Sequence, residues 1–379
     1  MNDDTLDTKG LYIGRAETEA EREAVFRFRY RIYVQEMGRY QSVADHERER
    51  FAEPVDDHSL LFYTSVDGPG SEVVATSRVT CGADGLSDRQ IDQYQLQPFL
   101  DRVPADVVAV GERAMVRPDL RGSSLFLDLM GQSFAEINQR RIELMFGASE
   151  AHLLSLYQSL GMRTYSQRNI NSTEAGYLIP QLLVVEDVEY LRRLKSPFAR
   201  FAKDFGDDRR IPDCLTELLS GGSAVMSRHL ASGEDYWEEV HEALEGAEGL
   251  RPSALDGLDQ EDAQRALEKS NIIECDPGDV VVKKGGVSRN LYVVLEGTLE
   301  VRDGERAVAV LSPGDVFGEM SFLLGRPRSM DVVAAVPDTR VLSLSESAIR
   351  SMIDEDPRSA SIMLLNLSKM LCLRLLKMN

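Results

Sequence analysis

The amino-acid sequence predicts two folded parts: an α/β domain with a mixed sheet and helices, then an all-β roll domain with flanking helices. In the first half, amphipathic helices and β-rich runs follow one another as in a mixed α/β layer. In the last third, short β-rich runs are separated by glycine-containing turns, as in an all-β roll. We therefore expect domains at residues 1–187 and 258–379, joined by a helical acidic connector at 188–257.

The order of elements in the first half follows from periodicity and turn signals. A helix is expected at residues 18–37, because Thr18 and Glu21 form a capping box before apolar residues at helical spacing. The turn Asp67-Gly68-Pro69-Gly70 separates two β-rich runs and predicts a hairpin. The remaining strands are expected at 107–116, 142–147, 163–166 and 177–185, with helices at 125–140 and 151–160.

The second half begins with a short predicted helix at 260–270. Several turns then divide the chain into short strands, at 276–279, 296–297, 303–304 and 313–315. A Pro-Gly-Asp-Val sequence occurs at both 277 and 313 and marks equivalent corners of the roll. Helices are expected at 345–353 and 357–378, the last of them amphipathic.

Composition excludes several classes of protein. The 379-residue chain has a net charge of −20, which disfavours nucleic-acid binding because that binding depends on phosphate neutralisation. No apolar run reaches the length of a membrane span, and the first ten residues are polar and acidic, so we expect a cytoplasmic protein. The cysteines are far apart, which indicates neither a metal site nor a disulfide framework: Cys81, Cys214, Cys275 and Cys372.

The stretch 317–332 combines features of an anion site. Gly318 lets a backbone approach a ligand, the short predicted helix at 319–324 offers free amides, and Arg328 can fork onto phosphate oxygens. Glu319 would repel a phosphate unless it accepted hydrogen bonds from hydroxyls of the same ligand. The pattern therefore indicates a sugar phosphate.

This stretch resembles the phosphate-binding cassette of cyclic-nucleotide-binding domains, in which Gly-Glu is followed by Pro-Arg-Ser/Thr-Ala. The resemblance implies that Arg328 holds the cyclic phosphate of cAMP, or alternatively of cGMP, and that Glu319 holds the ribose hydroxyl. Gly318 and Ser329 would make the remaining contacts, whereas Met330 stands where the family has Ala or Thr. In that family the C-terminal helix covers the purine or pairs with a second subunit, so a homodimer is an open alternative.

A second predicted anion site follows the strand that ends at Val116. The turn places Arg121, Gly122, Ser123 and Ser124 at the start of a helix. Residues 12–185 thereby resemble the GNAT acyltransferase superfamily, which grips the pyrophosphate and pantetheine of an acyl thioester at this turn. Ser124 and Phe126 depart from the superfamily's pattern, which has small residues at these positions. Phe126 is expected to obstruct a CoA pyrophosphate.

The order of motifs narrows the resemblance to acyl-homoserine-lactone synthases and N-acyl amino acid synthases. These motifs are residues 26–40, Asp56-Asp57-His58, Arg78 and residues 112–116. Such relatives use long-chain acyl groups on acyl carrier protein, which would tolerate Phe126, or on CoA. An acidic carrier would need a local basic patch, for which the candidates are Arg117, Arg121, Arg140 and Arg141.

For acyl transfer to an amine, a proton must leave the amine and an oxyanion must be stabilised. Glu112 is the candidate general base, Arg78 and Arg113 are candidates for binding an acceptor carboxylate, and His58 is a weaker acid/base candidate. No nucleophile triad is evident, which favours direct transfer, and no metal is required.

The sequence therefore predicts an N-acyltransferase that is regulated by a cyclic nucleotide. One alternative is a cAMP-regulated protein lysine acetyltransferase that uses acetyl-CoA. Another is a non-catalytic cyclic-nucleotide sensor with an acyl-binding module.

Overall fold

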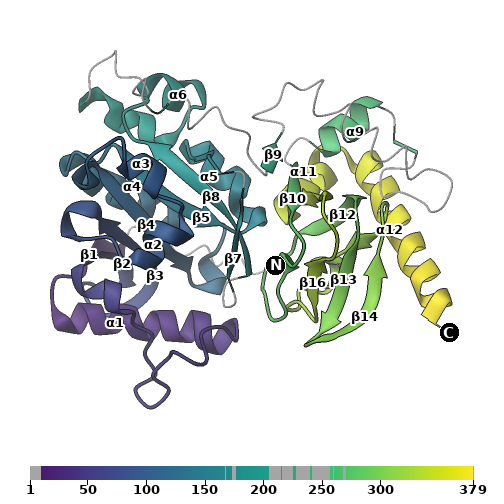
Figure 1. Cartoon of the computed structure of the whole chain (residues 1–379), viewed down its shortest axis with the longest axis horizontal. Helices are drawn as coiled ribbons and strands as arrows, with labels where there is room; N and C mark the ends of the chain where they lie inside the picture. Colours follow the sequence, from purple (N-terminus) through teal and green to yellow (C-terminus); the bar gives the residue numbers. More distant parts are fainter. Residues whose placement is uncertain are drawn as a thin grey trace. The chain divides into compact units, whose positions relative to one another are not determined.

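The computed structural model describes residues 10–166, 168–172, 176–204, 215, 225–227, 240, 257–258, 260–267 and 270–378. The chain forms two compact units (Figure 1). Unit 1 comprises Met1–Ala148, Leu156–Tyr165 and Pro180–Gly221, and unit 2 comprises Ser149–Ser155, Ser166–Ile179 and Gly222–Asn379. Two segments from the first half of the sequence thus belong to unit 2. In the part of the chain that is described, no helix is long and apolar enough to cross a membrane.

The first-half sequence builds an eight-stranded sheet among the described residues. Along one path its strands are β1 (Leu11–Arg15), β2 (Leu60–Val66), β3 (Glu72–Cys81), β4 (Val108–Val116), β5 (Leu144–Ser149), β8 (Gly176–Val184) and β6 (Arg163–Thr164), while β7 (Ile170–Ser172) pairs with β8. Strands β1 to β4 pair antiparallel, whereas β4 and β5 are parallel. The predicted mixed α/β layer is therefore confirmed.

Two helices cover opposite faces of strands β2 and β3. Helix α1 (Glu19–Arg29) begins at the predicted capping box and continues as the π-helical segment η2 (Tyr30–Glu36). It packs on Leu61 and Tyr63, while helix α4 (Leu125–Gln139) packs on Phe62. Because neighbouring strand residues point to opposite faces, α1 and α4 lie on different sides of the sheet. Figure 1 shows α1 below the strands and α4 among the helices of the other layer.

Short helices fill the connections of this half. The segment before β2 contains η3 (Pro54–His58), and the long connection between β3 and β4 contains η4 (Gly82–Asp84), α2 (Asp88–Gln93), α3 (Gln97–Leu100) and η5 (Ala105–Val107). The others are η6 (Pro118–Leu120), η7 (Ala151–Leu153), α5 (Leu154–Leu160), α6 (Val188–Arg193) and η8 (Pro197–Asp204). The sequence prediction had no helices between residues 82 and 107, and these helices turn out to matter for the site.

Unit 2 contains the predicted roll as two sheets. One has the order β15 (Val316–Phe317), β12 (Leu291–Glu296), β17 (Thr339–Leu344), β10 (Ser270–Cys275) and β9 (Val225–Ser227). The other has the order β11 (Val280–Val282), β16 (Asp331–Ala334), β13 (Leu299–Asp303) and β14 (Arg306–Leu311). The apolar core includes Tyr292, Phe317 and Val332, together with Leu154 and Tyr177 from the first-half segments of this unit.

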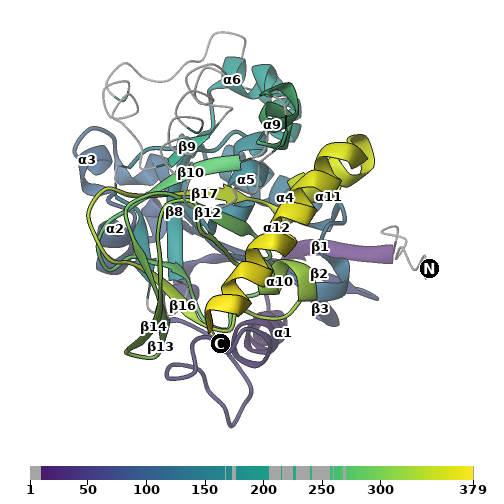
Figure 2. The same cartoon turned by 90° about the vertical axis from the view of Figure 1, so that its right-hand side faces the viewer.

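The flanking helices of unit 2 also agree with the prediction. They are α9 (Gln260–Ala266), α10 (Glu319–Leu324), α11 (Glu346–Glu355) and α12 (Pro357–Met378). Figure 2 shows α12, in yellow, as one long helix that ends at the C-terminus. Within the described residues Cys81, Cys275 and Cys372 are free cysteines. Most of the expected acidic connector, including Trp237, lies outside the described residues.

Candidate functional sites

Strands β3 and β4 bring two of the predicted site residues together. Arg78 and Glu112 are direct cross-strand partners, so their side chains leave the same face of the sheet. The Arg78 Nη2 atom donates to Glu112 Oε2 at 2.8 Å. Arg78 is 2% exposed, which makes this a buried ion pair.

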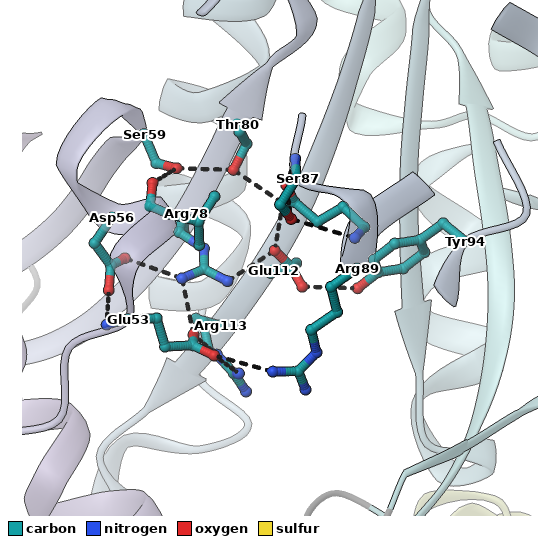
Figure 3. A network of polar contacts seen from close by, with 12 residues as sticks. Glu53, Asp56, Ser59, Arg78, Thr80, Ser87, Arg89, Tyr94, Glu112 and Arg113 are labelled. Atoms are coloured by element: carbon teal, nitrogen blue, oxygen red, sulfur yellow. Dashed lines mark hydrogen bonds and ion pairs between the residues drawn. The ribbon is translucent and has the colours of Figure 1, made fainter. Parts of the chain in front are cut away.

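Two further carboxylates reach the same place from the segment around η3. Glu53 and Asp56 both accept from Arg78 Nη1, at 2.8 and 3.0 Å. The fully buried Arg29 of α1 also donates to Asp56, at 2.8 Å. Asp56 additionally accepts from the Glu53 amide at 2.7 Å, which fixes the local turn. We call the connected side chains Arg29, Glu53, Asp56, Arg78, Glu112 and Arg113 the ionic network (Figure 3).

Arg113 completes the ionic network from an unusual backbone position. Its φ is +57°, in the left-handed region, and it lies within a register shift in the β3–β4 ladder, between Glu112 and Met115. The Arg113 Nε and Nη2 atoms donate to the two oxygens of Glu53 at 2.7 and 2.6 Å, and Nη1 donates to the Tyr40 hydroxyl at 2.6 Å. Its guanidinium also lies over the rings of Tyr33, Tyr40 and Phe51. Arg113 is therefore fully engaged within the protein.

Helix α2 supplies two contacts to Glu112 that the sequence did not reveal. Gln90 Nε2 donates to Glu112 Oε2 at 2.9 Å, and the Tyr94 hydroxyl donates to Glu112 Oε1 at 3.2 Å. Gln90 also closes a capping box with Ser87 and donates to Thr80 at 3.1 Å. Figure 3 shows Tyr94 pointing at Glu112 from the side opposite Arg78. A capping box at Ser87 and Gln90 was the available sequence signal for this helix.

The electrostatics of the ionic network keep its acids ionised. Burial by itself would raise the pKa of Glu112, but Arg78 and Arg113 outweigh it and lower that pKa. The pKa of Glu53 is likewise held well below its ordinary value, because Arg113 and Arg78 outweigh the effect of burial. Glu112 at neutral pH is thus a carboxylate that accepts three hydrogen bonds. A carboxylate so stabilised is a weak proton acceptor.

The remaining catalytic candidate lies apart from the ionic network. His58, at the end of η3, is exposed. The sequence prediction had His58 as a weaker acid/base candidate. The structure brings together Arg78, Glu112 and Arg113, but not His58.

The hydrogen-bonded ladder between β4 and β5 ends beside the ionic network. Their parallel pairing runs from Val108 with Leu144 to Val110 with Phe146 and stops there, although β4 continues to Val116. Gly111 and Gly147 follow the last pair, and a Cβ atom on Gly147 would lie 3.2 Å from the Gly111 carbonyl oxygen. Beyond Val110, β4 therefore has backbone groups that β5 does not occupy. Such groups are available for hydrogen bonds to a ligand.

The predicted elbow after β4 has the expected backbone. Val116 ends β4, Gly122 has a φ of +87° with open space where a Cβ would be, and Ser124 precedes α4. Ser123 Oγ accepts from the Leu125 amide at 3.3 Å. The Arg121 Nε atom donates to the Val116 carbonyl at 3.1 Å. The turn is an ordered helix start of the kind that binds anions.

Phe126 and the candidate basic residues have partners within the protein. The half-buried Phe126 ring packs edge-on against Tyr157, with 5.7 Å between ring centroids. Arg117 pairs with Glu72 and Asp119. Arg121 pairs with Glu36, and Arg140 pairs with Asp84 and Glu136. These candidate arginines therefore form salt bridges with acidic residues of the protein.

In unit 2 the cassette residues form a second site. Gly318 has a φ of +88° and begins α10, where Glu319 is mostly buried. A Cβ on Gly318 would lie 2.6 Å from the Asn290 carbonyl oxygen and would also collide with the Arg328 guanidinium, so only glycine fits. Ser329 is exposed and Met330 is half-buried.

Arg328 is the electrostatic centre of the cassette. It is 4% exposed, and it donates to the carbonyls of Gly318 and Asn290 at 2.9 and 2.7 Å and to Ser288 Oγ at 3.3 Å. Its buried Nε atom has no hydrogen-bond partner. Burial lowers the pKa of Arg328, an effect that the charges of Glu150 and Glu319 partly offset. A buried guanidinium held by neutral acceptors is suited to receive an anion.

Comparison with known proteins identifies the second site. Residues 272–356 match the family model described as "Cyclic nucleotide-binding domain". Curated relatives include the cyclic nucleotide-gated channel beta-3 of Canis lupus familiaris, 31% identical over 101 residues, which are 25% of this chain and 13% of the relative. The acetyltransferase Pat of Mycolicibacterium smegmatis is 31% identical over 99 residues, 25% of this chain and 27% of the relative. The chain thus spans about an eighth to a quarter of the length of these relatives.

Solved structures match each half separately. A cyclic nucleotide-binding domain from Methylobacillus flagellatus is 20% identical and covers 41% of this chain and 85% of that structure, with a TM-score of 0.33. The CoA-dependent acyl-homoserine lactone synthase BjaI is 17% identical and covers 53% of this chain and 92% of that structure, with a TM-score of 0.38. In the described residues, no group of three or more His, Cys, Asp or Glu residues could hold a metal ion.

Proposed function

We propose that this protein is an N-acyltransferase that moves an acyl group from a thioester carrier to an amine, under the control of a cyclic nucleotide. The observation that carries the transferase assignment is the separation of β4 and β5 beyond Val110, between the elbow after Val116 and the ionic network. This arrangement offers backbone donors, an anion-binding turn and fixed charges next to one another along β4. The donor is an acyl group on acyl carrier protein or on CoA.

In the proposed reaction the amine nitrogen attacks the thioester carbonyl carbon and a C–N bond forms. The C–S bond then breaks, and the released thiolate takes a proton while the nitrogen loses one. Backbone N–H groups of β4 beyond Val110 would stabilise the tetrahedral oxyanion. The lowered pKa of Glu112 makes it a weak base. Glu112 therefore either takes the proton through a water molecule or serves only to orient Arg78. In both cases the amine must arrive uncharged.

The regulatory assignment depends on Arg328 and on the family match over residues 272–356. We infer that the effector is cAMP, with cGMP as the alternative. Arg328 would hold the cyclic phosphate, Glu319 the ribose hydroxyl, and Gly318 and Ser329 the adjacent ligand atoms. Support for coupling comes from unit 2 itself, because its core includes Leu154, which lies in sequence between β5 and β6, and Tyr177, which lies in β8 of the sheet.

The test is a transfer assay with purified protein, a series of acyl thioesters and amine acceptors, with and without cAMP. Wild type should change its rate when cAMP is added, and Arg328→Ala should not. Equal rates in all four conditions would remove regulation from the proposal, and absence of transfer from every thioester would favour a non-catalytic sensor.

The similarity to the acetyltransferase Pat favours one alternative, a cAMP-regulated protein lysine acetyltransferase that uses acetyl-CoA. The same assay separates the two. A preference for acetyl-CoA and for lysine side chains supports the alternative, whereas a preference for long acyl chains and small amines supports the N-acyltransferase. We further infer a cytoplasmic location. Exposed Leu365 and Leu373 on α12 support a homodimer through this helix.

A further inference from the structure

One cation beside the ionic network is held only loosely. Arg89 lies on α2, next to Gln90, and its side chain is 66% exposed. Its Nη1 atom lies 3.9 Å from Glu53 Oε1, a distance too long for a hydrogen bond. Figure 3 shows the Arg89 side chain extending from α2 toward Glu53.

The charges of the ionic network balance without Arg89. Its cations are Arg29, Arg78 and Arg113, and its anions are Glu53, Asp56 and Glu112. Three positive and three negative charges cancel, so Arg89 adds one positive charge in excess. An excess cation at the solvent side of a neutral, buried cluster attracts an anionic group of a ligand.

The buried arginines cannot take that role at low cost. All three nitrogens of the Arg113 guanidinium donate within the protein, two of them to Glu53. Arg78 donates to three carboxylates. A substrate carboxylate would have to displace one of these acids and leave it buried without its partner. Arg89 needs no such exchange, because its contact with Glu53 is already long.

The backbone that carries Arg89 is nevertheless well fixed. Its neighbour Gln90 is 4% exposed and bonds to Ser87, Thr80 and Glu112. The start of the Arg89 side chain is therefore held relative to Glu112, while its guanidinium can move to meet a ligand.

We propose that Arg89 is a specificity residue that binds an anionic group, a carboxylate or a phosphate, on the amine acceptor. This inference rests on the proposed acyl transfer, because it names the acceptor class for that site. Glycine and 2-aminoethyl phosphate represent the two anionic groups, and glycinamide and ethanolamine are their neutral counterparts.

The first test compares acceptor kinetics of wild type, Arg89→Gln and Arg89→Lys. Arg102→Gln is the matched control, because Arg102 is another exposed arginine of the same connection, bonded to the Pro98 carbonyl. In Arg89→Gln the KM for the anionic acceptor should rise about tenfold with kcat little changed, the usual size for a lost charge-assisted hydrogen bond. The neutral acceptors should be unaffected, and Arg89→Lys should recover part of the loss. A preference for glycine assigns the carboxylate, and one for 2-aminoethyl phosphate assigns the phosphate.

The second test does not need catalysis. Calorimetry measures the binding of N-dodecanoylglycine, N-dodecanoylglycinamide and N-dodecanoyl-2-aminoethyl phosphate to wild type and Arg89→Gln. The proposal predicts that wild type prefers an anionic product over the amide and that Arg89→Gln loses this preference. Equal binding of the three in wild type, or a preference that survives in Arg89→Gln, overturns it. If no thioester supports transfer but the preference depends on Arg89, the proposed enzyme fails while the anion site stands.

Discussion

Replacing Glu53 by glutamine should destabilise unit 1 strongly, although Glu53 is not in a strand of the sheet. The substitution removes the one carboxylate that joins Arg78 and Arg113, through hydrogen bonds of 2.8, 2.7 and 2.6 Å at a side chain 15% exposed. It leaves two buried guanidiniums with one negative partner fewer. Losing one partner of a buried ionic cluster costs about 3–5 kcal/mol.

The matched control is Glu72→Gln. Glu72 also pairs with an arginine at 2.7 Å, but it is 55% exposed, and exposed pairs contribute about 0–1 kcal/mol. Scanning calorimetry can follow unit 1, and addition of cAMP identifies the transition of unit 2. For a unit of this size, the expected loss corresponds to a decrease in Tm of roughly 6–20 °C. If Glu53→Gln lowers Tm no more than Glu72→Gln does, the ionic network does not hold the unit together.

The loss of folding stability at acidic pH gives an independent check on the role of Glu53. The pKa of Glu53 is lower in the folded protein than in the unfolded chain. Its contribution to stability is therefore complete above the unfolded pKa of about 4.3 and is lost as pH falls below that value. Wild type should lose more stability than Glu53→Gln on acidification. Parallel pH curves for the two proteins would contradict the assignment.

Four further predictions concern single side chains. Arg328→Ala should weaken cAMP binding at least 100-fold in calorimetry, while the exposed neighbouring Arg326→Ala should change it little. Glu150→Gln should tighten cAMP binding a few-fold, because the negative charge of Glu150 interacts favourably with Arg328 and competes with the phosphate. Glu112→Gln should lower kcat about 10²–10⁴-fold if Glu112 passes the proton; thermal unfolding is measured in parallel, because the substitution also removes an ionic partner of Arg78, and Glu112 itself should add no acid limb near pH 7 because its pKa is lowered. Burial raises the pKa of Asp279 to about 6, so unit 2 should lose stability as pH rises from about 4 to about 6, and Asp279→Asn should flatten this slope in calorimetry.

Local signals were sufficient for most of the fold. The capping box at Thr18 begins α1 as expected, and the turn at 67–70 joins β2 and β3. The cassette could be recognised because its residues lie within one short stretch, in which Gly318 and Arg328 are ten positions apart and the pattern resembles that of a known family. The family match over residues 272–356 confirms the cyclic-nucleotide-binding domain.

The ionic network could be predicted only in part, because it depends on contacts between distant segments. Arg78 and Glu112 were recognised through a resemblance, but their cross-strand pairing comes from the register of β3 and β4. Glu53 is 60 positions from Arg113, and nothing in its own sequence neighbourhood indicates that partner. Gln90 was missed because the connection that contains α2 was treated as irregular chain, although its capping box was visible.

The buried arginines of the ionic network already have carboxylate partners, and this determines which substitutions can test substrate binding. A buried guanidinium that already donates to carboxylates stabilises the fold and sets the local potential, so substituting Arg78 or Arg113 perturbs folding before it perturbs substrate binding. Loss of activity in such variants would say little about catalysis. Substitutions at Arg89 leave these buried pairs intact. Their kinetic effects can therefore be assigned to substrate recognition, which is the property that distinguishes a small-molecule N-acyltransferase from a protein acetyltransferase.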